Sequence, residues 1–456
     1  MQVILTHGYS IIDDVREQQI MKPYAPLGIL YISGWLDAHG INNHVIDTTF
    51  ITQDEQWNQI KEAKPEFLGV YVNLMTRKNV VQLIKKIKQE INLKHTKIIL
   101  GGPEVRNNAQ QWLQTGADVL VVGEGEITFE TLVTSWKTHK DLYQIAGIYF
   151  LDESGNMHFT GEREKIKDID ILPFPARQHI SIQKYLEVWK SRHGKNAISV
   201  STMRGCPYTC KWCSRAVYGM SYRRRSPQKV VEELQHIQEV YNPDTIWFVD
   251  DVFTISHKWL EEFARCVKEA NLTLPYECIS RADRMNAEVI HLLKESGCFR
   301  VWIGAESGSQ RIIDAMDRRV KVESVQEMIR LSNANGIETG TFIMLGYPGE
   351  TELDIVQTVK HLKAALPDLF TITTAYPIRG TELFAEIQND IINEPDWANS
   401  SDRDVTFKRN YPESYYKHAV RYVVNETNYA KSKAPLLKLK SMLARMMMWY
   451  TRKFAV

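Results

Sequence analysis

Three cysteines within eight positions are the side chains of this sequence best suited to chemistry. They lie in the segment Cys206-Pro-Tyr-Thr-Cys210-Lys-Trp-Cys213, and thiolates are the usual protein ligands of iron–sulfur clusters. Three thiolates at this spacing can hold three corners of a cubane and leave the fourth iron open to an amine and a carboxylate. A zinc site with a distant fourth ligand and a set of buried free thiols are the alternatives. Zinc sites usually pair such a unit with a second pair or with histidines, so the pattern favours a cluster.

The bulk composition is that of a folded chain without an extreme charge. Its 456 residues are 44% hydrophobic and 24% charged, with a formal net charge of +1, which gives no field that would attract nucleic acid. The length predicts about two to four domains. Six cysteines are too few for a disulfide scaffold, so we expect a reducing cytoplasm. No apolar run is long enough to span a membrane, and the start MQVILTHGYS is predicted to be a strand rather than a signal peptide.

The cysteine segment directly follows the first of six predicted strands that alternate with helices from Ala197 to about residue 384. Six such units fit a partial (β/α)6 barrel rather than an eightfold one, and barrel enzymes carry their chemistry at the carboxyl ends of the strands. The predicted strands are Ala197–Thr202, Thr245–Val249, Tyr276–Ser280, Val301–Ile303, Thr339–Leu345 and Thr371–Tyr376.

A second series of strands and helices precedes the barrel. The predicted strands are Gln2–Thr6, His44–Asp47, Phe67–Val72, Lys97–Leu100 and Val119–Val122. Their alternation with helices predicts a parallel, doubly wound sheet that binds ligands at the carboxyl ends of its strands. Gly101-Gly102-Pro103 and Gly123-Glu-Gly-Glu126 stand at two such ends. These glycines form tight turns, line a ligand crevice, or do both.

We therefore predict an α/β protein in four parts. A doubly wound, Rossmann-like domain covers 1–145, and a linker covers 146–194 with a hairpin around Ser154-Gly155. Pro173 and Pro175 keep the end of the linker extended. The partial barrel covers 195–385, and a mostly helical region covers 386–456.

The C-x3-C-x2-C pattern after the first barrel strand resembles the signature of the radical S-adenosylmethionine (SAM) superfamily. The resemblance implies that Cys206, Cys210 and Cys213 hold a [4Fe-4S] cluster and that SAM chelates its open iron. An electron from the cluster would cleave SAM to a 5′-deoxyadenosyl radical, which removes a hydrogen atom from an unactivated carbon. We name no catalytic residue beyond the three cluster ligands.

Later strand ends resemble the SAM-contact motifs of the same superfamily. Asp250 and Asp251 match the site of the SAM amino group, although one of them could cap a helix instead. Arg281 could face the SAM carboxylate or form a surface ion pair, and Glu306 and Ser307 resemble ribose-binding positions. The remaining predicted SAM contacts are Trp212 near the adenine, Gly346 and Glu350 in the turn after the fifth strand, and Tyr376 after the sixth.

The N-terminal domain together with this barrel resembles the cobalamin (B12)-binding radical SAM class, which includes the anaerobic magnesium-protoporphyrin monomethyl ester cyclase. The matching segments are Pro23-Tyr24-Ala-Pro26-Leu27-Gly28, the two glycine turns, and the linker Leu172-Pro173-Phe-Pro175-Ala176. A flat corrinoid needs an apolar sheet edge with glycine turns close to its nucleotide tail. The predicted cobalamin contacts are Tyr24, Pro26, Leu27, Gly28, Gly101, Gly102, Gly123, Gly125 and Glu126.

One motif of many corrinoid proteins is missing. The D-x-H-x-x-G sequence, whose histidine ligates cobalt, is replaced after the first strand by His7-Gly8-Tyr9-Ser10. We interpret His7 as an ordinary residue at the end of a strand. The lower face of a bound corrinoid is then not held by a protein histidine.

Two basic segments provide information on binding partners. Arg223, Arg224 and Arg225 are interpreted as the solvated start of a helix, with an anionic substrate group as the alternative. Residues 431–456 carry seven basic and no acidic side chains among Leu, Met and Trp residues. That pattern predicts a helix packed on the barrel with a solvated basic side, or an amphipathic helix that contacts an anionic membrane surface.

The leading hypothesis is an oxygen-sensitive, cobalamin-dependent radical SAM enzyme that methylates an unactivated centre of a small organic or lipid-like substrate. Its expected reductant is a flavodoxin or ferredoxin, it has no nucleic-acid partner, and it works in the cytoplasm, peripheral to the membrane if the tail docks there. A radical SAM cyclase or oxidase without methyl transfer is the alternative among enzymes. A non-catalytic iron–sulfur or zinc module, such as a redox sensor, is the alternative from another class, and the ordered SAM motifs disfavour it.

Overall fold

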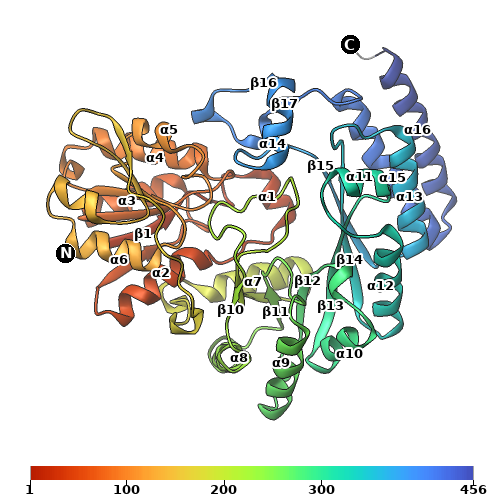
Figure 1. The fold of residues 1–456 in the computed structure, drawn as a ribbon, viewed down its shortest axis with the longest axis horizontal. Helices are drawn as coiled ribbons and strands as arrows, with labels where there is room; N and C mark the ends of the chain where they lie inside the picture. The colour runs from red at the N-terminus through yellow and green to blue at the C-terminus, as the bar shows by residue number, and fades with distance from the viewer. Residues whose placement is uncertain (1, 455–456) are drawn as a thin grey trace.

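The N-terminal part folds around a seven-stranded sheet of order β2-β1-β3-β4-β5-β6-β7, in a computed structural model that describes residues 2–454 (Figure 1). The first five strands run parallel, which confirms the predicted doubly wound sheet. They are β1 (Val3–His7), β2 (Asn43–Ile46), β3 (Phe67–Tyr71), β4 (Lys97–Gly101) and β5 (Val119–Val121).

Helices cover both faces of this sheet because its strands are apolar on both sides. Leu30 and Leu132 belong to the core on one face, and Ile84 and Trp112 belong to the core on the other. The helices are α1 (Val15–Ile20), α2 (Leu27–Ala38), α3 (Gln53–Ala63), α4 (Arg77–Gln89), α5 (Ala109–Thr115) and α6 (Glu126–Ser135).

The predicted hairpin around Gly155 is present, and it extends the first sheet. Its strands β6 (Ile148–Leu151) and β7 (Met157–Phe159) add antiparallel to β5. Gly155 turns the chain with φ of 82°, a value that glycine adopts without strain. The linker then forms two short 3-10 helices, at Ile169–Ile171 and Arg177–His179, with an extended stretch at Pro173 and Pro175 between them, before α7 (Ile182–His193) leads into the barrel.

The second sheet has six parallel strands in the order β15-β14-β13-β12-β11-β8. It confirms the predicted partial barrel, with helices packed on its outer face (Figure 1). The strands are β8 (Ala197–Val200), β11 (Thr245–Phe248), β12 (Tyr276–Ser280), β13 (Cys298–Glu306), β14 (Glu338–Leu345) and β15 (Leu369–Thr374). The helices are α8 (Pro227–Tyr241), α9 (His257–Glu269), α10 (Ala287–Glu295), α11 (Gln310–Ala315), α12 (Val322–Ala334) and α13 (Glu352–Ala365).

The remaining chain returns to both parts of the molecule. After α14 (Glu382–Ile387), a small hairpin of β16 (Ile391–Asn393) and β17 (Thr406–Phe407) brings residues 394–404 beside the N-terminal domain. Two helices, α15 (Glu413–Ser432) and α16 (Pro435–Phe454), then pack outside the barrel, on the side away from the N-terminal domain (Figure 1). Among residues 2–454, no helix combines the length and the apolar character needed to cross a bilayer.

Candidate active site

The three clustered cysteines lie in one loop between two short strands, β9 (Met203–Arg204) and β10 (Arg223–Arg224). Gly205 starts the loop with φ of 84°, and a Cβ there would overlap the carbonyl oxygen of Ser221. Glycine is therefore required for the loop to leave β9 in this direction. Cys210 is buried, and Cys206 and Cys213 are half-buried.

The thiols lie close enough to affect one another. Burial, the carboxylate of Asp251, and the thiols of Cys206 and Cys210 together raise the pKa of Cys213 to about 12. Within residues 2–454, no three His, Cys, Asp or Glu side chains converge as they would around one metal ion. A cubane binds each thiolate at a different iron, so its ligands need not converge on a single point.

Two arginines support the innermost thiol. Nη1 of Arg281 and Nη1 of Arg318 each lie 3.7 Å from Sγ of Cys210. Arg281 also donates to Asp283 and to the carbonyl of Arg318, and its guanidinium stacks 3.8 Å from the Tyr208 ring centroid. Positive charge at the ligating sulfurs stabilises an anionic cluster and tunes its potential. The donor set therefore fits a [4Fe-4S] cluster, and the structure places Arg281 beside the thiol.

The two neighbouring aspartates have different environments. Asp250 is buried, and it accepts hydrogen bonds from the backbone N–H of Thr202 at 2.7 Å and of Met203 at 3.2 Å. It also accepts from the Thr202 hydroxyl. Its carboxylate thus fixes the turn that leads into the cluster loop. Desolvation and the charge of Asp250 raise the pKa of Asp251. Both aspartates line the larger cavity, but Asp250 is buried whereas Asp251 is exposed, so Asp251 is the member of the pair that a ligand can reach.

Glu306 and Ser307 follow a bulge at the end of β13. Glu306 has φ of 63°, a left-handed conformation that is strained for glutamate. Its Oε1 lies 3.7 Å from Nη2 of Arg318. The Ser307 hydroxyl accepts from the N–H of Ser309 at 3.1 Å and contacts Thr358. The backbone strain is therefore at Glu306, whereas the Ser307 hydroxyl stabilises the loop that follows β13.

The remaining predicted SAM positions surround the ends of β14 and β15. The N–H of Gly346 donates to Oε2 of Glu350 at 2.6 Å, and Oε1 of Glu350 is buried without a hydrogen bond. Burial raises the pKa of Glu350 to about 8. Trp212 packs on an apolar cluster that includes Met316 and Tyr347, and Tyr376 is half-buried with Arg403 5.8 Å from its ring centroid.

Three cavities lie between the cluster loop and the N-terminal sheet, and two of them share part of their lining. The larger, of about 420 Å³, is lined by Cys206, Asp251, Leu27, Gly28 and Pro103, among others. The smaller, of about 230 Å³, lies at the carboxyl ends of β3, β4 and β5. Both are lined by Gly28, Tyr31, Arg204, Val217 and Tyr218, so they adjoin each other between the two sheets, and we call the pair the recess.

Glycines keep the smaller cavity open. Gly101, Gly102, Gly123 and Gly125 all line it. A Cβ on Gly101 would meet nothing within 4 Å, and Gly102, with φ of 115°, has no room for a Cβ beside the carbonyl oxygen of Val72. An apolar cavity lined by backbone suits a flat macrocycle with a nucleotide tail.

Three other predicted cobalamin positions have structural contacts. Tyr24 packs edge to face on Trp189 at 5.4 Å between ring centroids, and Pro26 precedes the first turn of α2. The Glu126 carboxylate accepts from Arg204 of β9. Arg204 also donates to Glu124 at 2.7 Å, and Arg223 donates to the other oxygen of Glu124 at 2.7 Å. We call these four side chains, Arg204, Arg223, Glu124 and Glu126, the cavity clamp.

The interpretation of Arg223–Arg225 as a solvated helix start was wrong. Arg223 belongs to the cavity clamp, and Arg225 is buried with Glu233 of α8. Arg224 donates to the carbonyl of Phe253 at 2.6 Å and stacks 3.4 Å from the Trp259 ring centroid. Arg223 and Arg224 face inward because their partners, Glu124 and Phe253, lie in distant segments, which the local sequence does not show. Arg225 pairs with Glu233 only eight positions along the chain.

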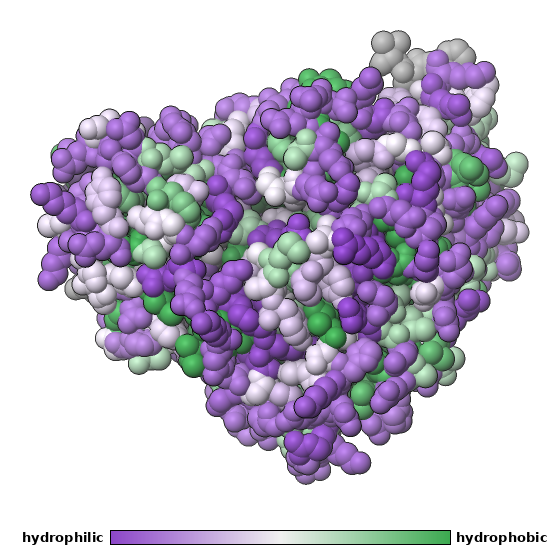
Figure 2. All heavy atoms as spheres, in the orientation of Figure 1, coloured by the Kyte–Doolittle hydropathy of each residue, from purple (hydrophilic) through white to green (hydrophobic). Residues whose placement is uncertain are grey.

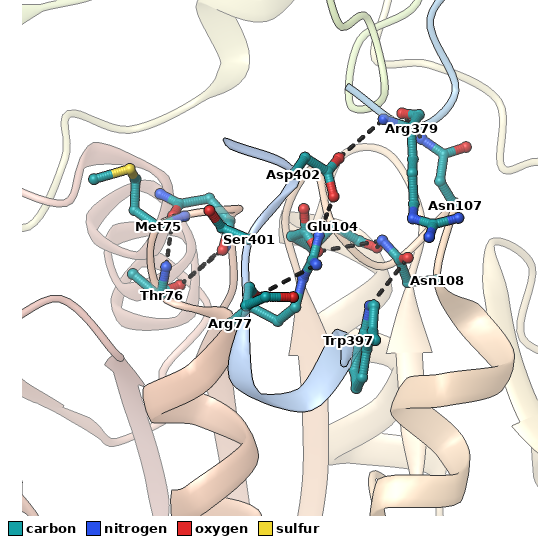
Figure 3. A network of polar contacts seen from close by, with 12 residues as sticks. Met75, Thr76, Arg77, Glu104, Asn107, Asn108, Arg379, Trp397, Ser401 and Asp402 are labelled. Atoms are coloured by element: carbon teal, nitrogen blue, oxygen red, sulfur yellow. Dashed lines mark hydrogen bonds and ion pairs between the residues drawn. The ribbon is translucent and has the colours of Figure 1, made fainter. Parts of the chain in front are cut away.

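A second charged cluster joins the N-terminal domain to residues 394–404 (Figure 3). Arg77 donates to Glu104 at 2.7 Å and to Asp402 at 2.6 Å, and all three side chains are buried. The other oxygen of Asp402 accepts from the N–H of Arg379 at 2.9 Å, and Trp397 donates to Asn108. We call residues 394–404 the strap, and Arg77, Glu104 and Asp402 the strap clamp. Sequence reasoning missed it.

The contacts of His7 confirm that it is an ordinary residue at the end of a strand. Its Nε2 lies 3.0 Å from Asp47, and its Nδ1 contacts the Thr48 hydroxyl at 3.1 Å. No histidine lines either cavity within the part of the chain that the structure describes.

Comparison with known proteins identifies both halves. A model described as the radical SAM superfamily matches residues 200–362, and a model described as a B12 binding domain matches residues 20–133. An uncharacterized methyltransferase of Pyrococcus horikoshii is 28% identical over 84% of this chain and 83% of its own length. The anaerobic magnesium-protoporphyrin IX monomethyl ester cyclase of Rubrivivax gelatinosus is 25% identical over 81% and 67%. The solved structure of the cobalamin-dependent SAM radical enzyme OxsB with aqua-cobalamin covers 97% of this chain and 72% of its own, with a TM-score of 0.78 and 17% identity.

Proposed function

The chain belongs to the radical SAM superfamily and carries a B12-binding domain, and from this premise we propose that it methylates an unactivated centre of a small organic or lipid-like substrate. It is a radical SAM enzyme, and its cofactors are a [4Fe-4S] cluster, SAM and cobalamin. When bound, these groups supply one-electron and methyl-transfer chemistry. The observation that carries the proposal is that the cavity lined by Cys206 and Asp251 adjoins the cavity lined by the glycine turns.

The residues around the recess have different proposed roles. Cys206, Cys210 and Cys213 are the proposed cluster ligands, and Arg281 and Arg318 hold positive charge at the innermost thiol. Asp251 can accept the ammonium of SAM from the wall of the larger cavity. The further proposed SAM contacts are Trp212, Asp250 through the turn that it fixes, Glu306, Ser307, Gly346, Glu350 and Tyr376.

The N-terminal half of the recess holds the proposed cobalamin. Leu27, Gly28 and the four cavity glycines offer apolar and backbone surface on which a corrinoid can lie flat. We propose that Tyr24, Pro26 and Glu126 support that surface. Since His7 pairs with Asp47, we propose that no protein histidine ligates the cobalt.

The inner face of the barrel supports an apolar substrate. Residues such as Cys278 and Ile303 pack on the helices outside the sheet. Since side chains alternate along a strand, the positions next to these residues point to the inner face. There Trp302 stacks on Phe342 with ring centroids 5.1 Å apart, and its indole N–H donates to Glu277 at 2.9 Å. Both rings are half-buried. Such a surface suits a flat or lipid-like molecule, and the name of the cyclase relative suggests a porphyrin ester as a first probe.

Anaerobic reconstitution with SAM deuterated in its methyl group tests the proposal. We expect about four iron per chain, lost on substitution of the three cysteines by Ala, and a stoichiometric cobalamin spectrum. With a flavodoxin or ferredoxin as reductant, label should move to cobalamin and to substrate. A protein that binds no cobalamin, or leaves the label in SAM, contradicts methylation.

The same experiment separates the alternatives. A cyclase or oxidase, favoured by the cyclase relative, forms 5′-deoxyadenosine and unlabelled product. A redox sensor forms no nucleoside at all. The free thiols of the six cysteines are consistent with our proposal that the reaction takes place in the reducing cytoplasm.

A further inference from the structure

One face of helix α16 packs on the rest of the protein. Ser441, Ala444 and Met448 are buried. The Glu426 carboxylate of α15 accepts from the Ser441 hydroxyl and from Lys438 at 2.8 Å. These contacts fix the rotation of the helix about its axis, and they confirm that it packs on the protein.

The opposite face of α16 is apolar and exposed. Leu439 is 53% exposed, Met442 60% and Met446 56%. Their spacing of three and four residues places them along one stripe, diametrically opposite the buried residues. The stripe continues through other exposed apolar side chains of the helix, namely Leu436, Leu443, Trp449 and Tyr450. Figure 2 shows hydrophobic atoms among hydrophilic ones at the edge where Figure 1 draws α16.

The charged side chains of α16 itself have one sign, and Arg452 among them pairs with Glu352 of α13 at 3.2 Å. Residues 413–456 contain nine Lys or Arg and two Glu, and neither Glu belongs to α16. Glu426 is already bound by Lys363 and Lys438. Lys440, Arg445 and Lys453 are exposed beside or at the end of the stripe. The face thus combines an apolar centre with cationic margins.

We propose that α16 docks lengthwise on an anionic lipid membrane. Its 20 residues span about 30 Å, and the described chain contains no helix that could span the bilayer. An exposed Leu/Met/Trp face with basic margins is the pattern of helices that lie in the plane of the interface. The docking holds the barrel at the surface where apolar substrates dissolve, but the inference does not depend on the reaction proposed above.

A second copy of this chain fits the same face less well. A two-fold contact would place the same basic margins of both copies beside each other. Lys440, Arg445 and Lys453 would then face like charges without a carboxylate on either helix. An anionic lipid surface supplies the missing negative charge.

Vesicle co-sedimentation of the full-length, cluster-loaded protein tests the proposal. The vesicles contain phosphatidylcholine with or without phosphatidylglycerol. The apolar variant is Leu439→Gln, Met442→Gln, Met446→Gln, and the cationic variant is Lys440→Gln, Lys453→Gln. The matched control, Ile91→Gln, Met157→Gln, Ile392→Gln, removes three exposed apolar side chains elsewhere on the surface. Gln forms helices well, so α16 should persist in each variant.

We expect the wild type and the control to sediment with anionic vesicles and the apolar variant to remain in solution. The cationic variant should bind about 25-fold more weakly, roughly fivefold for each charge, and high salt should release the wild type. Equal binding by all four proteins, or no binding by the wild type, overturns the proposal. So does a wild-type dimer in sedimentation velocity that the apolar variant converts to monomer, because a second copy then covers the face.

Discussion

Two buried charge clusters join the N-terminal domain to the rest of the protein, and they differ in what lies beside them. The cavity clamp borders both cavities, since Arg204 lines both of them and Glu124 and Glu126 line the smaller one. The strap clamp lies at the loop after β15 and the segment 394–404 (Figure 3). Both pair arginine with two carboxylates from another segment. The difference suggests that one clamp shapes the cofactor recess, while the other only holds the domains together.

The largest expected effect comes from Arg204→Met. It leaves Glu126 buried without its arginine, and removal of one partner of a buried ion pair costs about 3–5 kcal/mol. We expect a large loss of stability in urea titrations of the anaerobic protein and loss of cobalamin binding in visible spectra. Adding Glu126→Gln removes the stranded charge, so the double variant should regain stability. A double variant no more stable than the single one contradicts the role of this pair.

Filling the recess should separate cobalamin binding from stability. Gly101→Leu places a side chain where a Cβ meets nothing within 4 Å, and its φ is not left-handed. We expect the urea midpoint to change little and cobalamin affinity to fall more than about tenfold. Gly155→Leu in the hairpin turn is the control, and it should strain the turn while leaving cobalamin bound. Unchanged affinity in Gly101→Leu means that the corrinoid lies elsewhere.

The strap clamp should give a smaller and different effect. In Asp402→Asn, Arg77 keeps its bond to Glu104, so the loss should be about 1–3 kcal/mol. We expect unchanged cobalamin affinity and faster proteolysis in 394–404, measured by limited digestion and mass spectrometry. Ser400→Ala nearby, which removes a hydroxyl bonded within its own segment, serves as the control. A loss of cobalamin in Asp402→Asn would remove the distinction between the clamps.

Sequence predicted the parts of this arrangement that depend on local pattern. The cysteine loop, the glycine turns and the alternation of strands with helices follow from spacing and from the pattern of apolar residues. The clamps do not, because Arg204 meets Glu126 across 78 positions and Arg77 meets Asp402 across 325. Arg223–Arg225 looked solvated for the same reason. Nothing in a local window distinguishes a surface arginine from one whose carboxylate partner lies in another domain.

Glu350 offers the sharpest contrast, because it is a buried carboxyl without an arginine partner. Burial raises its pKa to about 8, so near neutral pH the folded protein keeps a proton that the unfolded chain has lost. Stability from this group therefore falls as pH rises from the ordinary glutamate pKa towards about 8, and then levels. Glu350→Gln mimics the protonated form and should remove this part of the slope. Urea midpoints of both proteins across that pH range provide the measurement. Parallel curves would mean that Glu350 is ionised in the fold.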